Sequence, residues 1–229
     1  MAREKYKNLH KKHTSVNKLL AGLSKKEEKP VSHQNMVAAQ GVYLQSQINT
    51  HFLFNTLSFI YQTANKYSEN LGNSVMILSD MMRYAILDTS TDTKVLLEEE
   101  IEQIGNLITL HQARFDNKLC LNFTVTGNMA GLTIIPFVLI TLVENIFKYA
   151  DLHSPLNPVH INIVVKSNVL NMEIRNKKGT SVLPVSHGIG LENVRKRLHL
   201  YFPKNYDLKI NDDHINYHLT LKINLNLLT

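Results

Sequence analysis

Two successive stretches with apolar residues at helical spacing constrain the fold of this chain most strongly. They run over residues 34–66 and 69–88, and in the second Val75, Leu78 and Met82 recur with the helical period. Two long amphipathic helices with a short connection form an αα-hairpin. Such a hairpin exposes so much apolar surface that pairing two of them into a four-helix bundle would stabilise both. The sequence therefore predicts a homodimer.

The pattern changes after a polar break at residues 88–94. Helical spacing predicts three further helices at 97–115, 136–149 and 191–200, and the first of them begins with Glu residues, which suits a helix N-terminus. Apolar runs and alternation predict strands at 119–125, 160–165, 169–174, 208–210 and 217–225. We expect an α+β fold, in which a helical hairpin precedes an α/β sandwich. The expected domains are a basic leader at 1–33, the hairpin at 34–92 and the sandwich at 93–229.

The net positive charge of the chain lies in its first residues. Residues 1–29 contain nine Lys or Arg and three Glu, which accounts for the whole formal net charge of +6. A basic leader can contact anionic lipid or nucleic acid, or it can be a solvated helix or tail. Tyr6 is its one aromatic residue, so base stacking has little support and we expect no nucleic-acid partner.

Neither a membrane span nor a secretory signal is expected. The longest strongly apolar stretch, residues 132–143, is too short to cross a bilayer, and no apolar run follows the basic N-terminus. Cys120 is the single cysteine, which excludes an intrachain disulfide. We expect a cytosolic location, with any membrane association supplied by a partner or by an upstream region.

One histidine, His51, lies in the strongly apolar helical stretch at residues 44–59. At about 100° per residue, His51 and Asn55 flank the edge of the apolar stripe. A histidine there lies beside a packed interface and can still be reached from outside. Because a neutral imidazole is a nucleophile near physiological pH, His51 is a candidate phosphate acceptor. The alternative is a histidine that only completes an interface.

Two further groups of residues are candidates for binding an anion. Glu144, Asn145 and Lys148 lie near the end of an apolar helical stretch, where they could hold Mg²⁺, orient a nucleophile and neutralise phosphate charge. Gly188 and Gly190 precede another helix, whose free N–H groups could bind an anion. Each signal is weak alone, because a helix that leaves a core commonly becomes polar and a Gly-x-Gly before a helix is frequent.

Taken in order, these motifs resemble one family, the LytS/YehU-type sensor histidine kinases with a Bergerat (GHKL) type of ATP-binding domain. The resemblance is carried by six strings in the family's order over residues 44–203: LQSQINTHFLFNTL at 44–57, LSDMMRY at 78–84, LEEEIEQI at 97–104, ARF at 113–115, IPFVLITLVEN at 135–145 and GIGLENVRKRLHLYFP at 188–203.

The resemblance implies roles for particular residues. It implies that the hairpin forms a dimer and carries His51 as the phosphoacceptor, and that the sandwich binds ATP and Mg²⁺. Glu144 would be the base or the carboxylate that orients water, and Asn145 the Mg²⁺ ligand. The implied ATP-binding residues are Asn145, Lys148, Asn176, Gly188, Gly190 and Asn193.

The chain departs from the family pattern at several of these places. Thr50 stands where a proline usually precedes the histidine, and Ile140-Thr141 replace a Gln-Pro pair. The usual adenine-reading Asp is Asn176, whose amide oxygen can accept from the adenine amino group without a charge-assisted bond. ATP binding is expected to be weaker for that reason.

The resemblance implies a two-component kinase core that autophosphorylates His51 from ATP and passes the phosphoryl group to an aspartate of a response regulator of the LytTR type. A degenerate pseudokinase that dimerises with and regulates an active relative is the first alternative, favoured by the departures. The second is a hydrolytic ATPase of the same superfold, in which Glu144 activates water, and the HFLFN segment argues against it.

Overall fold

The computed structural model describes residues 50–87, 94–179 and 189–225. All of them belong to one compact unit, Asn49–Thr229. The predicted leader at 1–33 and the first half of the predicted helix at 34–66 lie outside the described residues.

The first two described helices form the predicted αα-hairpin. Helix α3 spans Thr50–Tyr67 and helix α4 spans Glu69–Leu87. Ser68 joins them, and its hydroxyl accepts the backbone N–H of Leu71 at 3.3 Å, which caps the start of α4. A Cβ atom at Gly72 would lie 2.7 Å from the side-chain oxygen of Asn65, so only glycine allows this close approach of the two helices.

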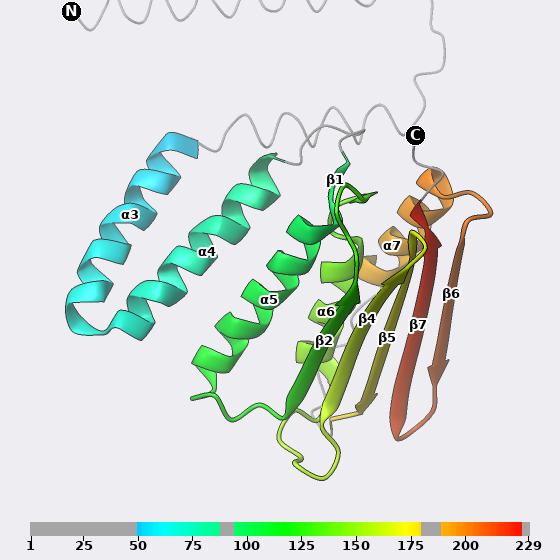
Figure 1. The fold of residues 1–229 in the computed structure, drawn as a ribbon. Helices are drawn as coiled ribbons and strands as arrows, with labels where there is room; N and C mark the ends of the chain where they lie inside the picture. The colour runs from blue at the N-terminus through cyan, green and yellow to red at the C-terminus, as the bar shows by residue number, and fades with distance from the viewer. Residues whose placement is uncertain (1–49, 88–93, 180–188, 226–229) are drawn as a thin grey trace, which may run out of the picture. The chain divides into compact units, whose positions relative to one another are not determined.

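A five-stranded mixed sheet is the centre of the remaining structure (Figure 1). Its strands lie in the order β2-β4-β5-β7-β6. Their bounds are Leu121–Gly127 for β2, Val159–Lys166 for β4, Val169–Lys177 for β5, Tyr206–Asp212 for β6 and Asn216–Asn224 for β7. Every neighbouring pair is antiparallel except β2 and β4, which are parallel.

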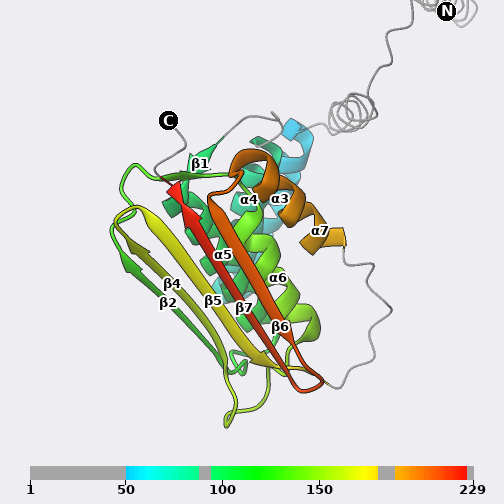
Figure 2. The same cartoon turned by 90° about the vertical axis from the view of Figure 1, so that its right-hand side faces the viewer.

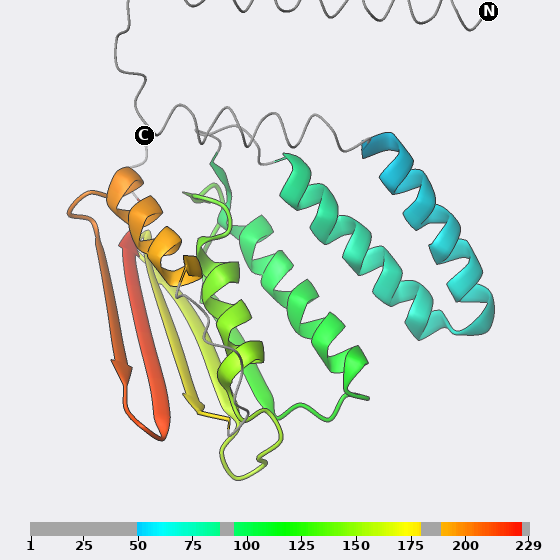
Figure 3. The ribbon, with the colours of Figure 1, turned by 180° about the vertical axis from the view of Figure 1, so that it is seen from behind.

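Three helices cover one face of this sheet (Figures 2 and 3). They are α5 (Leu97–Arg114), α6 (Val138–Tyr149) and α7 (Ile189–Tyr201). The buried side chains of β4 and β5 alternate with exposed ones, because one sheet face contacts the helices and the other faces solvent. The expected α+β fold, a helical hairpin followed by an α/β sandwich, is confirmed.

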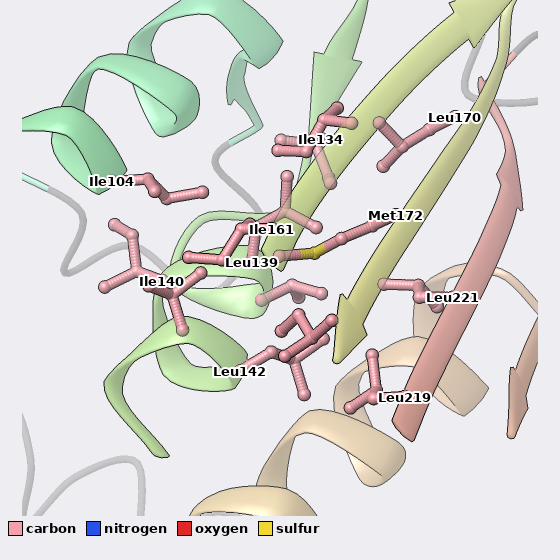
Figure 4. Close-up of a cluster of buried hydrophobic side chains, with 14 of the residues drawn as sticks. Ile104, Ile134, Leu139, Ile140, Leu142, Ile161, Leu170, Met172, Leu219 and Leu221 are labelled. Carbon is pink, nitrogen blue, oxygen red and sulfur yellow. The ribbon is translucent and has the colours of Figure 1, made fainter. Parts of the chain in front are cut away.

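The core of the sandwich lies between these helices and the sheet. It is built from aliphatic side chains of α6 and of the central strands (Figure 4), among them Leu139, Leu142, Ile161, Met172 and Leu221. All five are almost completely buried. The apolar stretch at residues 132–143 therefore contributes side chains to the core between the helices and the sheet. No helix among the described residues is long and apolar enough to cross a membrane.

The turn between β4 and β5 consists of Ser167 and Asn168. Both residues have positive φ angles, of 49° and 58°, which is the backbone conformation of a type I′ hairpin turn. This turn sets the register in which Ile161 pairs with Ile174 and Ile163 with Met172. Four inward-facing side chains thereby meet in two cross-strand pairs.

Two features of the sandwich were absent from the sequence-based expectation. The strands β1 (Val95–Leu96) and β3 (Thr133–Ile134) form a small antiparallel ladder just before α5 and α6. In addition, β2 and β4 are joined through α6 as a parallel pair, so the sheet is mixed and contains one βαβ unit. Both pairings join segments far apart in the sequence, where local periodicity carries no signal.

Candidate functional site

His51 is the second residue of α3, and its side chain is exposed. The amide nitrogen of Asn55, one turn further along, lies 3.2 Å and 3.3 Å from the two ring nitrogens. Asn55 therefore touches the imidazole edge from the same helix face. The exposed imidazole of His51, with the Asn55 amide beside it, can be approached by a reactant from solvent.

The second group of candidate residues lies in the C-terminal half of α6. The Lys148 ammonium forms an ion pair with the Glu144 carboxylate at 2.5 Å, one turn apart, and both side chains are about half exposed. Asn145, between them, is half-buried. The Lys148 side chain therefore lies against Glu144, one turn before it on the same helix.

The end of β5 is fixed beside the end of α6 by backbone hydrogen bonds. The Gly179 N–H donates to Tyr149 at 2.8 Å, and the Asp151 N–H donates to Lys177 at 2.9 Å. A Cβ atom at Gly179 would lie 3.2 Å from the carbonyl oxygen of Ala150, so the two segments touch closely here. A ligand bound at the C-terminal end of α6 would therefore lie next to the C-terminal end of β5.

Asn176 lies at this end of β5 and is one of the few buried polar side chains, with 8% exposure. Its amide nitrogen donates to the carbonyl oxygen of Lys177 at 3.0 Å. The amide is held in one orientation by that bond, and its oxygen is the group that remains for an incoming donor.

The start of α7 lies against α6. A Cβ atom at Gly190 would lie 3.3 Å from Cγ2 of Thr141, so the first turn of α7 touches the first turn of α6. Asn193 is exposed on the next turn, and Gly188 lies outside the described residues.

A neighbouring group on α5 modifies the electrostatics of the α6 site. The His111 ring is stacked on the Phe147 ring, with centroids 3.7 Å apart and an interplanar angle of 6°. Partial burial lowers the pKa of His111 below 6.5, the nearby Arg114 lowers it further, and the Glu144 charge partly opposes them. His111 was not among the predicted site residues, because nothing in the sequence aligns α5 with α6.

Glu144, Asn145 and Lys148 lie on α6 between its contact with the start of α7, at Thr141, and its contact with the end of β5, at Tyr149. His51 lies on α3, which contacts α4, while α4 contacts α5 and α5 contacts α6. Within the described part of the chain, no cluster of three or more His, Cys, Asp or Glu residues could hold a metal ion by itself.

A fully buried carboxylate, Glu100 of α5, caps the N-terminus of α6. Its oxygens accept the backbone N–H groups of Phe137, Leu139 and Ile140 at 3.0, 2.9 and 3.2 Å, and the Tyr84 hydroxyl of α4 donates to the same carboxylate. Burial raises the pKa of the Glu100 carboxyl, and these hydrogen bonds oppose that shift. Glu100 belongs to the acidic start of α5, and its helical spacing with Leu97 and Ile104 places it on the buried stripe of that helix.

Comparison with known proteins gives the context for these groups. The model of the histidine kinase family matches residues 39–119, which include His51, α3, α4 and α5. The sensor protein LytS of Staphylococcus saprophyticus is 27% identical over 185 residues, which cover 75% of this chain and 31% of that protein. The resemblance to LytS-type histidine kinases is confirmed.

Other LytS-type relatives match in the same way. LytS of Enterococcus faecalis is 28% identical over 169 residues, covering 68% of this chain and 28% of that protein. The sensor histidine kinase BtsS of Escherichia coli is 29% identical over 170 residues, covering 73% and 30% respectively. This chain spans about three tenths of the length of these LytS-type relatives. A solved structure of the histidine kinase AdeS of Acinetobacter baumannii also matches, with a TM-score of 0.41 and 16% identity over 83% of this chain and 93% of that chain.

Proposed function

We propose that this chain is the core of a two-component histidine kinase, which binds Mg-ATP at the end of α6 and transfers the γ-phosphoryl group to His51. The observation that carries the proposal is that the polar turn of α6 lies between the contact of α6 with the start of α7, at Thr141, and its contact with the end of β5, at Tyr149. The similarity to LytS-type relatives supports the same reading. In this proposal residues 34–92 carry the phosphoacceptor and 93–229 bind the nucleotide.

Each part of the α6 site has a separate task in nucleotide binding. Asn176 would accept a hydrogen bond from the adenine amino group through its amide oxygen, because its nitrogen already donates to Lys177. Lys148 would leave the Glu144 carboxylate and neutralise phosphate charge. Gly190 allows the first turn of α7 to approach α6 closely, and Asn193 and Gly188 would complete the ATP contacts that the resemblance implies.

The donor set at α6 fits a metal ion that the nucleotide brings with it. Mg²⁺ prefers oxygen ligands and usually keeps several waters, bound through one or two protein groups and substrate phosphates. The Asn145 amide oxygen is such a group, and no metal-binding acidic cluster exists among the described residues. Bound there, Mg²⁺ would supply charge neutralisation at the β- and γ-phosphates.

The transfer itself is an in-line displacement at phosphorus. A His51 ring nitrogen attacks the γ-phosphorus, the bond to the β,γ-bridging oxygen breaks, and ADP leaves with that electron pair. The N–P bond replaces the O–P bond, and the proton on the other ring nitrogen passes to a base, for which Glu144 is the candidate. Because His51 lies on α3, transfer requires the α6 site of one protomer to meet a His51 by domain movement or across a dimer.

Dimerisation and the next acceptor belong to the same proposal. Phe52 and Phe59 on α3 are each 68% exposed, and Leu71 and Met76 on α4 are also exposed. Apolar surface of this extent on one hairpin supports a homodimeric four-helix bundle. The phosphoryl group on His51 would then pass to an aspartate of a response regulator of the LytTR type.

The test is autophosphorylation with γ-labelled ATP and Mg²⁺. Wild type is compared with His51→Gln, Asn145→Ala and the control His160→Gln, which changes an exposed histidine on the solvent face of the sheet. We expect acid-labile, alkali-stable label in wild type and the control, and none in the two site variants. ATP binding without label would instead favour a regulatory pseudokinase, and absence of both would overturn the proposal.

A further inference from the structure

The N-terminus of α6 is held by a residue from another helix. The first N–H groups of a helix have no partner within it and must be satisfied by a cap or by water. In α6 no local side chain caps these groups, and the N-cap residue Phe137 has a left-handed backbone with φ of 59°. The Glu100 carboxylate of α5 accepts three of the N–H groups instead. The N-terminus of α6 is therefore capped by a single buried carboxylate from α5.

The hairpin reaches the same carboxylate. Tyr84, near the end of α4, donates its hydroxyl to the Glu100 oxygen that also accepts the Phe137 N–H. The Tyr84 ring also meets the Phe137 ring edge-to-face, with centroids 5.2 Å apart and an interplanar angle of 63°. One side chain of the hairpin thus contacts both the cap of α6 and the residue at its N-terminus.

These contacts make α4 and α6 members of one hydrogen-bonded unit. A helix moves as a nearly rigid body, so a displacement of its capped end is transmitted to the turn with Glu144, Asn145 and Lys148. We propose that Tyr84 is a positioning residue that couples the hairpin to α6 through Glu100, so that the hairpin and the nucleotide-binding turn sense each other's position. A role of this coupling in phosphotransfer rests on the proposed function. The hydrogen bond between Tyr84 and Glu100 does not.

The coupling must act in both directions, because linkage between two sites is reciprocal. Nucleotide bound at α6 should slow amide hydrogen exchange at the end of α4. A variant in which α4 no longer bonds to Glu100 should show a smaller decrease in the exchange rate. Tyr84→Phe is a selective variant, since it removes the hydroxyl, keeps the ring against Phe137 and leaves Glu100 with its three backbone donors.

Amide hydrogen exchange tests this directly. Exchange of a peptide covering residues 82–87 is measured with and without Mg²⁺ and a non-hydrolysable ATP analogue. We expect the analogue to slow exchange about fivefold or more in wild type, and to slow it by less than half as much in Tyr84→Phe at an unchanged Kd for the analogue. Tyr67→Phe, on the same hairpin with its side chain 84% exposed, should respond as wild type does.

An equal response in Tyr84→Phe and wild type would overturn the coupling while leaving the kinase proposal intact. Failure of wild type to bind the analogue would instead count against the kinase proposal. In that event the melting temperatures of Tyr84→Phe, Glu100→Gln and the double variant decide the coupling without nucleotide. We expect the double variant to lose less than the sum of the single losses. Additive losses would show that the two side chains do not act as a unit.

Discussion

The imidazole of His111 lies flat on the ring of Phe147, with centroids 3.7 Å apart and planes 6° from parallel. This stack joins the end of α5 to the turn of α6 that carries Glu144 and Lys148. A stacked, partly desolvated imidazole is more stable uncharged, which is why burial lowers the pKa of His111.

The first prediction concerns the pH dependence of stability. Because the folded pKa of His111 lies below its ordinary value of 6.5, protonation favours the unfolded chain. The stabilisation is complete above about pH 6.5 and is lost as the pH falls through the folded pKa. His111→Phe keeps a ring on Phe147 and should flatten this loss, measured by urea unfolding between about pH 5 and 7.5. His160→Gln, on the exposed sheet face, should keep the slope of wild type, and an unchanged slope in His111→Phe would contradict the assignment.

The second prediction concerns the buried cap of α6. Glu100→Ala leaves three backbone N–H groups of α6 without their acceptor, and the expected loss in the free energy of unfolding is about 2–4 kcal/mol. Glu98→Ala changes an exposed acid on the same helix and should cost less than about 0.5 kcal/mol. Denaturant titration of the two variants measures both values. Similar small losses in both would mean that water replaces the carboxylate as the cap.

The third prediction is that the charge of Lys148 affects ATP binding more than it affects the free energy of unfolding. Its ion pair with Glu144 is half exposed, so removing it should change the free energy of unfolding by less than about 1 kcal/mol. If Lys148 neutralises phosphate charge, Lys148→Met should weaken ATP binding about tenfold, as measured by calorimetric titration. Lys209→Met breaks an ion pair with Asp207 of the same 2.5 Å length on β6, and its ATP affinity should remain that of wild type. Equal affinities in both variants would remove Lys148 from the proposed site.

The fourth prediction concerns the exposed apolar stripe of the hairpin. Phe59→Glu places a charge on the proposed dimer interface, where burial of an unpaired charge is unfavourable, so the protein should sediment as a monomer with unchanged helix content. Ser58→Glu introduces the same charge at the adjacent exposed position and tests whether the effect depends on the apolar stripe. A wild-type chain that is already monomeric at micromolar concentration would rule out the proposed bundle.

Local periodicity predicted most helices and strands of this fold. The helix expected at 97–115 is observed as Leu97–Arg114, and the strands expected at 160–165 and 169–174 are observed as Val159–Lys166 and Val169–Lys177. The start of α6 was expected at residue 136 and is observed at Val138. That difference has a non-local cause, because Glu100, 37 residues before Phe137, decides where the first N–H groups of α6 are capped.

The candidate site was predictable only in its separate parts. Asn145 and Lys148 follow from one turn of a helix, whereas Asn176 follows only from the family resemblance. Their meeting depends on hydrogen bonds between Gly179 and Tyr149 and between Asp151 and Lys177, which join segments about 26–30 residues apart. The stack of His111 on Phe147 spans a similar distance, and no single-sequence pattern encodes it.

The parallel pairing of β2 with β4 has a consequence for the order in which the molecule can form during synthesis. The contacts between α3 and α4 join segments that are neighbours in the sequence, and both helices are complete once Leu87 has left the ribosome. Helix α6, by contrast, gains its sheet surface only after β4, at Val159–Lys166, has been translated and has found β2. The segment that bears the histidine therefore matures first, and the segment that bears the nucleotide-binding groups must wait for chain made after it.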